Sequence, residues 1–173
     1  YIDNWLIRYK ADLAETLYIR KGTHGVADMN SFQKRYLKGV TFPEGLKYIG
    51  SEAFERTDLK SVKLPRTVEL MKYSAFRGTK IKEITLPASM KRVDKWVFMD
   101  CEQLDRITVE GKDTQIVWPA VTGHHNGTPM IIESPLNSHA QAYCEKYGKK
   151  YNLVFEEKKP VVKNNIFTLR RKK

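Results

Sequence analysis

The chain has 173 residues, of which 41% are hydrophobic and 29% charged, as is typical of one globular domain. No run approaches the roughly 20 apolar residues of a membrane-spanning helix, and the first residues lack the basic start and hydrophobic stretch of a signal peptide. The net charge is +11, but seven of the 31 basic residues lie in residues 158–173, which contain no acid. The other 24 bases are accompanied by 20 acids, and this mixed charge over residues 1–157 argues against a dedicated phosphate-binding surface.

The first 36 residues predict an N-terminal cap followed by a degenerate repeat. Residues 4–10 look like the strand that often opens repeat arrays. A first repeat then begins at residues 17–22 and ends at Phe32, with Arg20 where later repeats carry proline.

From residue 37 to residue 112 the sequence repeats regularly. Proline recurs every 22 residues at Pro43, Pro65 and Pro87. Apolar triplets precede each proline and return once more after one inserted residue: Leu37, Val40, Phe42; Leu59, Val62, Leu64; Ile81, Ile84, Leu86; Leu104, Ile107, Val109. A second apolar pair follows each proline: Leu46 and Ile49; Val68 and Met71; Met90 and Val93. Such self-similarity is the mark of a repeat architecture.

Each repeat is interpreted as one coil of a solenoid. The alternation at 62–64 predicts a strand with one buried face, which Pro65 ends because proline cannot donate to a sheet ladder. A small residue followed by Phe76 predicts a tight turn that drives the ring into the core. Because one coil cannot bury its apolar face alone, we expect Phe76 to be buried between Phe54 and Phe98 of the neighbouring coils.

Residues 113–157 predict a closing loop and cap. Two prolines and an Asn-Gly pair in the segment 118–129 break the repeat and predict a loop. Ile131 and Ile132 are taken as part of this closing segment. Ser138 can cap a helix that presents Ala140, Tyr143, Cys144 and Tyr147 on one face and stops at Gly148, and residues 151–155 then predict a last strand. The basic segment 158–173 is interpreted as a tail or linker.

The repeat resembles the BspA-like leucine-rich repeats of bacterial surface proteins. The shared pattern is L-x-x-V-x-L-P followed by A-F about ten residues later, with the F-x-x-C-x-x-L variant at 98–104. The asparagine of ordinary leucine-rich repeats is absent at the corresponding Gly45, Thr67, Ser89 and Lys112. The resemblance implies a leucine-rich-repeat solenoid, a β-rich (α+β) right-handed superhelix of ~22-residue coils, with a C-terminal capping helix and strand and one domain over 1–157.

The outward side of the strands is the candidate binding surface, because solenoids bind through extended regular faces. Its outward positions are Thr41, Lys63, Thr85 and Thr108, preceded near the start of each strand by Gly39, Ser61, Glu83 and Arg106. No aromatic row appears there, which argues against a platform for stacking sugars or bases. The alternative is a solvated β-surface without a ligand.

Other candidate sites carry weaker signals. His124 and His125 lie in the predicted loop and, with His139 and Glu133, could bind zinc, but their spacing does not preorganise a metal site. We therefore expect no metal or organic cofactor. Cys101 and Cys144 have no metal or redox spacing and are either buried thiols or a disulfide. Catalytic motifs are absent from the sequence, so we do not expect an enzyme.

The resemblance implies a non-catalytic binding module for protein–protein or host and cell-surface recognition, since BspA-like proteins are mostly surface-exposed or secreted adhesive proteins. The partner is then expected to be a protein or a surface ligand. The alternative is an intracellular scaffold or nucleic-acid accessory module that uses the basic tail at 158–173.

Overall fold

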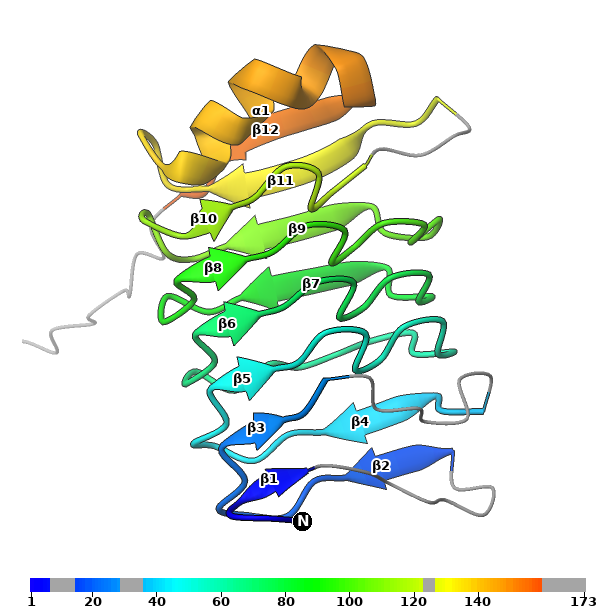
Figure 1. Ribbon diagram of the computed structural model, residues 1–173. Coiled ribbons are helices and arrows are strands. Elements are labelled where there is room, and N and C mark those ends of the chain that lie inside the picture. The colour runs from blue at the N-terminus through cyan, green and yellow to red at the C-terminus, as the bar shows by residue number, and fades with distance from the viewer. Residues whose placement is uncertain (7–14, 29–35, 123–126, 160–173) are drawn as a thin grey trace, which may run out of the picture.

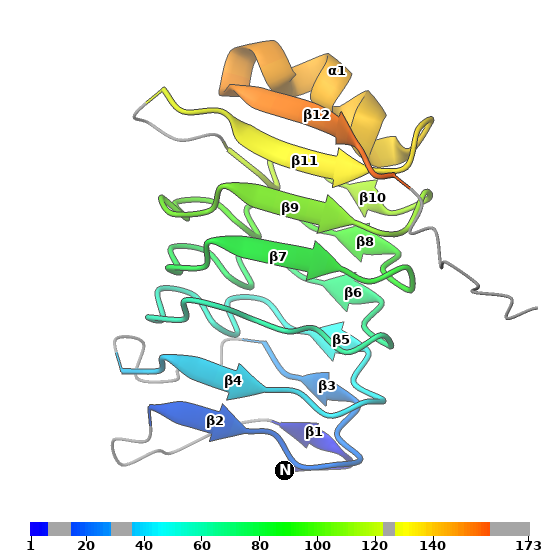
Figure 2. The ribbon, with the colours of Figure 1, turned by 180° about the vertical axis from the view of Figure 1, so that it is seen from behind.

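The computed structural model describes residues 1–6, 15–28, 36–122 and 127–159. These segments form a solenoid whose coils stack along one axis, with short strands on one side and longer strands on the other (Figures 1 and 2). Within these segments no helix combines the length and apolar character needed to cross a membrane. The stacked coils confirm the predicted solenoid of leucine-rich-repeat type.

One side of the solenoid is a six-stranded parallel sheet of two-residue strands. They are β1 (Trp5–Leu6), β3 (Gly25–Val26), β5 (Tyr48–Ile49), β6 (Leu70–Met71), β8 (Arg92–Val93) and β10 (Gln115–Ile116). Ile49, Met71 and Val93, which end the predicted second apolar pairs, are each buried at the second position of a strand. The sequence predicts these apolar positions but not the strands that contain them.

The longer strands on the other side belong to two parallel sheets (Figure 2). A two-stranded sheet pairs β2 (Thr16–Tyr18) with β4 (Gly39–Thr41). A four-stranded sheet, in the order β12-β11-β9-β7, contains β7 (Glu83–Leu86), β9 (Arg106–Val109), β11 (Met130–Ser134) and β12 (Leu153–Glu157). The burial pattern of β7 alternates from exposed to buried, as one buried face requires.

The strand predicted at 62–64 has the expected burial but not the expected hydrogen bonds. Val62 and Leu64 are buried and Lys63 is exposed. Within the described segments, however, no backbone hydrogen bond joins residues 61–64 to the coils on either side, and this coil separates the two sheets. Burial depends on which side chains enter the core, whereas a ladder also requires backbones within hydrogen-bonding distance.

The core is organised around a stack of phenylalanines, as predicted. Phe54, Phe76 and Phe98 are buried. The Phe76 ring stacks on the rings of Phe54 and Phe98, with ring centroids 5.3 Å and 6.2 Å apart, respectively. The turn that carries each ring lies between two residues with left-handed backbone, and both positions recur from coil to coil: Glu52, Ser74 and Trp96 before the ring, and Arg56, Gly78 and Asp100 after it. The same turn is therefore repeated in three coils.

The predicted break in the repeat at residue 118 is wrong over the part that the structure describes. Residues 113–122 form another coil, in which Ala120 and Val121 are buried and the Phe98 amide donates to the Ala120 carbonyl at 3.0 Å. Val121 thus takes the place of the next phenylalanine. A smaller apolar residue at this position hides the continuation in the sequence.

Helix α1 (His139–Tyr151) and β12 close the end of the solenoid (Figure 1). The predicted cap is confirmed, because the Ser138 hydroxyl accepts from the Gln141 amide at 3.1 Å. The predicted stop at Gly148 is wrong: the helix continues to Tyr151 and ends at Asn152 in the left-handed conformation. Gly148 instead permits close approach, since a Cβ there would lie 2.7 Å from the Leu153 carbonyl oxygen.

Candidate binding face

The outward side chains of the longer strands form one continuous surface, here called the ladder face. Strand pairing places Glu83 beside Arg106 and Thr85 beside Thr108. The other strand pairings and the 22-residue repeat give the equivalent positions in the remaining coils, and together these positions form two rows along the solenoid. The first row is Thr16, Gly39, Ser61, Glu83, Arg106, Ile131 and Val154, and the second is Tyr18, Thr41, Lys63, Thr85, Thr108, Glu133 and Glu156.

The structure brings the predicted strand positions together on this face. Thr41, Lys63, Glu83 and Thr85 are exposed, whereas Arg106 and Thr108 are half-buried. His124 and His125 lie outside the described residues. The role of all these residues in binding stays a prediction.

Arg106 differs from the other candidates because its charge is already neutralised. One guanidinium nitrogen, Nη1, lies 2.7 Å from Glu156 Oε2 and 3.2 Å from Glu133 Oε2. The Thr108 hydroxyl also donates to Glu133, at 3.3 Å. The hydrogen bond to Glu156 is the main cause of a raised Arg106 pKa. Arg106 therefore links β9 to β11 and β12 rather than offering a free cation to a ligand.

This network predicts unequal effects for two charge reversals on the ladder face. Arg106→Glu places a third carboxylate beside Glu133 and Glu156, and we expect it to lower the free energy of unfolding by about 1 kcal/mol, a value limited by partial solvent exposure. Lys63→Glu breaks no ion pair in the described part of the chain and should change stability by no more than about 0.5 kcal/mol. Urea denaturation of both variants measures the difference, and equal losses would contradict the assigned role of Arg106.

The middle of the ladder face is hollowed beside the unpaired coil 61–64. Its lining includes Lys63, Arg66, Glu83 and Thr85, with Arg106 and Thr108 at the adjoining strand. Cationic, anionic and hydroxyl groups therefore surround one depression, an arrangement that suits a polar ligand better than an apolar one.

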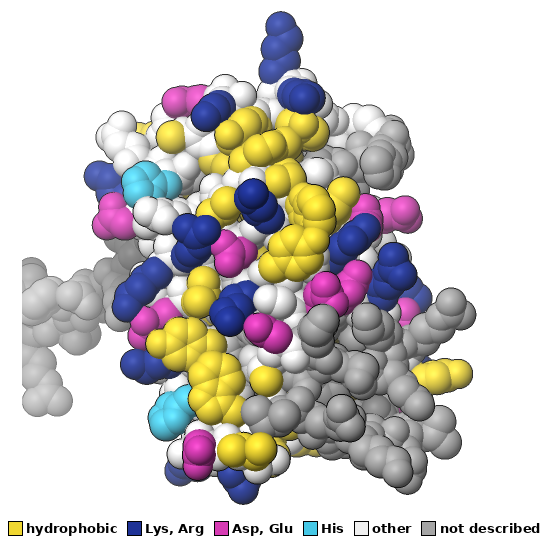
Figure 3. Space-filling model, in the orientation of Figure 1, with side chains coloured by type: hydrophobic (Ala, Val, Ile, Leu, Met, Phe, Trp, Pro, Cys, Tyr) yellow, Lys and Arg dark blue, Asp and Glu magenta, His cyan; other side chains and the backbone are white. Residues whose placement is uncertain are grey.

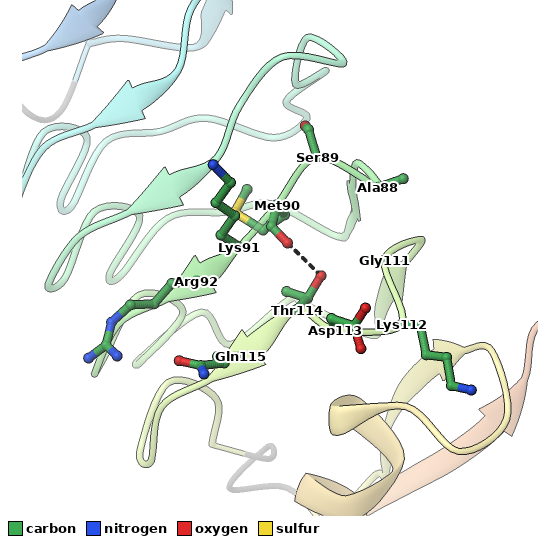
Figure 4. Close-up of a pocket in the computed structure, with 10 residues that line it drawn as sticks. All are labelled: Ala88, Ser89, Met90, Lys91, Arg92, Gly111, Lys112, Asp113, Thr114 and Gln115. Carbon is green, nitrogen blue, oxygen red and sulfur yellow. Dashed lines mark hydrogen bonds between the residues drawn. The ribbon is translucent and has the colours of Figure 1, made fainter.

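A second hollow lies between the coils at 88–92 and 111–115, where the Thr114 hydroxyl donates to the Met90 carbonyl at 2.8 Å (Figure 4). The basic side chains of Lys91, Arg92 and Lys112 point in different directions and do not converge on this hollow (Figure 4). Lys91 and Arg92 are moreover paired with Glu69 and Asp94. This second hollow is therefore a weaker candidate than the ladder face.

The opposite side carries aromatic residues that the sequence interpretation missed. Trp5 lies over Gly25 and stacks on Tyr48, with ring centroids 5.8 Å apart, and Tyr73 contacts Trp96 at 5.0 Å. Figure 3 shows hydrophobic side chains scattered among charged ones over this side. These contacts join rings to each other across coils, so they bind the array together. Trp5 and Tyr48 hold the first positions of β1 and β5, whereas Tyr73 and Trp96 follow the short strands of their coils.

The remaining predicted ligands do not assemble a metal or redox site in the described segments. There, no group of three or more His, Cys, Asp or Glu residues is placed to hold a metal ion. Cys101 and Cys144 are free and buried, so the disulfide alternative is wrong and the buried-thiol alternative is confirmed. Burial raises the pKa of both thiols, that of Cys144 to about 12, which keeps them protonated at neutral pH.

Comparison with known families fits this geometry. A family model described as BspA type leucine rich repeat region matches residues 27–146 in six copies, well over half of the chain. The chain belongs to the BspA-type leucine-rich-repeat family. No curated protein and no solved structure matches it. The match runs beyond the predicted regular repeats at 37–112, in agreement with the additional coil at 113–122. Leucine-rich-repeat solenoids are in general non-catalytic scaffolds that bind proteins.

Proposed function

We propose that this BspA-type repeat protein is a non-catalytic module that binds a protein or surface ligand through its ladder face. The observation that carries the proposal is the hollow in that face, where Lys63, Glu83 and Thr85 are exposed and the strands on one side form a regular hydrogen-bonded sheet. The backbone of the hydrogen-bonded strands needs little reordering on binding, which lowers the cost of association.

The family supports a location at a cell surface or outside the cell, where recognition of a host or cell-surface protein would take place. The alternative role, an intracellular scaffold or nucleic-acid accessory module, depends on the basic tail. One tail residue, Lys158, has its ammonium group 3.3 Å from Glu110 and so lies against the solenoid. Residues 160–173 lie outside the described segments, and no contact of the described residues favours this alternative.

Site-specific photo-crosslinking tests which face binds. A photo-reactive amino acid replaces Thr85 on the ladder face or, as the matched control, Gln115 on the six-stranded sheet; both are exposed polar strand residues. Each protein is exposed to extracellular-matrix and cell-surface proteins with and without an excess of unlabelled chain. We expect saturable crosslinks from position 85 and none from position 115. Saturable crosslinks only from position 115, or from neither position, would refute the proposed face.

A further inference from the structure

Ion pairs neutralise more than half of the basic residues of the regular repeats. Most of these pairs join side chains about one or two coils apart in the sequence, whereas Arg56 and Arg92 pair within their own coils. Examples are Lys38 with Glu15, Lys47 and Lys91 with Glu69, Lys72 with Asp28, Arg77 with Asp100, and Lys80 with Asp58. The basic residues without a partner are therefore the ones whose charge is left for a ligand.

Four of these unpaired residues lie on the two successive coils that border the hollow in the ladder face. They are Lys60, Lys63, Arg66 and Lys82, here called the cation cluster, and all four are exposed. Lys60 and Lys82 hold the same position in successive coils, where the Lys82 amide lies 3.4 Å from the Lys60 carbonyl oxygen. Lys63 and Arg66 line the hollow. In the described part of the chain, none of the four side chains has an ion-pair partner.

The cluster coincides with the coil that lacks ladder hydrogen bonds. Residues 61–64 lie between Lys60 and Arg66, and within the described segments their backbone groups pair with neither adjacent coil. Lys60 and Lys82 hold equivalent positions in successive coils, so their like charges repel each other. Carboxylates from a ligand would relieve this repulsion and gain charge-assisted hydrogen bonds.

We propose that the cation cluster binds an acidic, extended segment of a protein partner. This inference rests on the proposed function and names the chemistry of the ligand. Carboxylates on alternate residues of an extended peptide are about 6.6–6.8 Å apart. That spacing allows successive acids to reach cations on one coil and on the next.

A protein segment fits this face better than a continuous polyanion does. Glu44 and Glu83 border the same hollow and have no ion-pair partner in the segments described. Further along the ladder face lie Glu133 and Glu156. A nucleic acid or a heparin chain carries negative charge along its whole length and would meet these carboxylates. A peptide can place hydroxyl or amide side chains opposite them.

Fluorescence anisotropy with a defined probe tests the inference on the full chain. The probe is a labelled ten-residue peptide in which Glu alternates with Ser and Thr, and its control has Gln in place of every Glu. One protein variant combines Lys60→Gln, Lys63→Gln and Lys82→Gln. Its matched control combines Lys47→Gln, Lys72→Gln and Lys91→Gln, which removes the same charge from the side of the short strands.

We expect the cluster variant to bind the acidic peptide at least about tenfold more weakly than the unmodified chain, and the control variant to differ by less than about twofold. The Gln peptide should not bind. Equal losses in both variants would show that net charge alone attracts the peptide and would overturn the inference. If heparin or an RNA oligonucleotide binds more tightly than the acidic peptide, and the cluster variant loses this binding, the ligand is a polyanion and the inference of a protein segment is wrong.

The crosslinking experiment separates this inference from the proposed function. If the acidic peptide does not bind while saturable crosslinks from position 85 persist in the cluster variant, the ladder face still binds a protein, but not through acidic groups. If the crosslinks at position 85 are absent from the unmodified chain, the proposed face itself is wrong. If the cluster variant loses both peptide binding and the crosslinks, the inference is supported.

Discussion

Phe76→Ala is expected to lower the free energy of unfolding by about 3–5 kcal/mol, the range for a buried aromatic truncated to alanine. The Phe76 side chain is 0% exposed and stacks on rings from both neighbouring coils, at 5.3 Å and 6.2 Å. Its removal leaves a cavity between two rings that the turns hold in place. Because stability in a solenoid depends on contacts between adjacent coils, the loss affects two interfaces.

Equilibrium urea denaturation measures this effect, and Tyr18→Ala is the control for loss of an aromatic ring. Tyr18 is 75% exposed, so its removal should change stability by no more than about 0.5 kcal/mol. A loss for Phe76→Ala that is no larger than the loss for Tyr18→Ala would show that the phenylalanine stack does not hold the coils together.

The sequence predicts the coil and its core because the 22-residue period repeats the same side chain at the same place. Phe54, Phe76 and Phe98 recur with that period, and the structure stacks them. The cap at Ser138 is also predictable, since capping requires only a local residue pattern. Local and periodic features of this solenoid therefore follow from one sequence.

Features that depend on exact backbone spacing could not be predicted in the same way. A two-residue strand such as Tyr48–Ile49 is too short to show alternation. Residues 62–64 alternate, yet their backbone pairs with no neighbouring coil in the described segments. Glycine often ends a helix, but Gly148 lies inside one, where the nearby Leu153 carbonyl oxygen leaves no room for a Cβ. Each of these depends on distances between segments.

The sequence predicts where the candidate site lies but not which of its charged side chains are already paired. The outward positions of the ladder follow from alternation, and the structure exposes Lys63 and Glu83 as expected. Arg106 has the same pattern, but its partners Glu133 and Glu156 are 27 and 50 residues away in sequence. Which cations remain free, and hence the cation cluster, becomes visible only when such pairs are known.

Gly50→Ala is expected to lower the free energy of unfolding by about 1–3 kcal/mol, the usual range for overpacking. An added Cβ would lie 2.5 Å from the carbonyl carbon of Ala27 and 2.6 Å from the Asp28 nitrogen. These are backbone atoms of the neighbouring coil, so no side-chain rotation can relieve the contact. The Gly50 amide also donates to the Val26 carbonyl at 2.8 Å, and separation of the coils would weaken that bond.

The matched control is Gly39→Ala, where the nearest atom to an added Cβ is the Thr16 hydroxyl oxygen at 3.1 Å. That atom belongs to a side chain that can rotate, so we expect a change of less than about 1 kcal/mol. Alanine at a compatible glycine position usually stabilises a protein by about 0.4–1 kcal/mol, because it restricts the unfolded chain. The prediction is therefore tested by whether Gly50→Ala lowers or raises the free energy of unfolding in urea denaturation. A more stable Gly50→Ala variant would show that the two coils are not held at this separation.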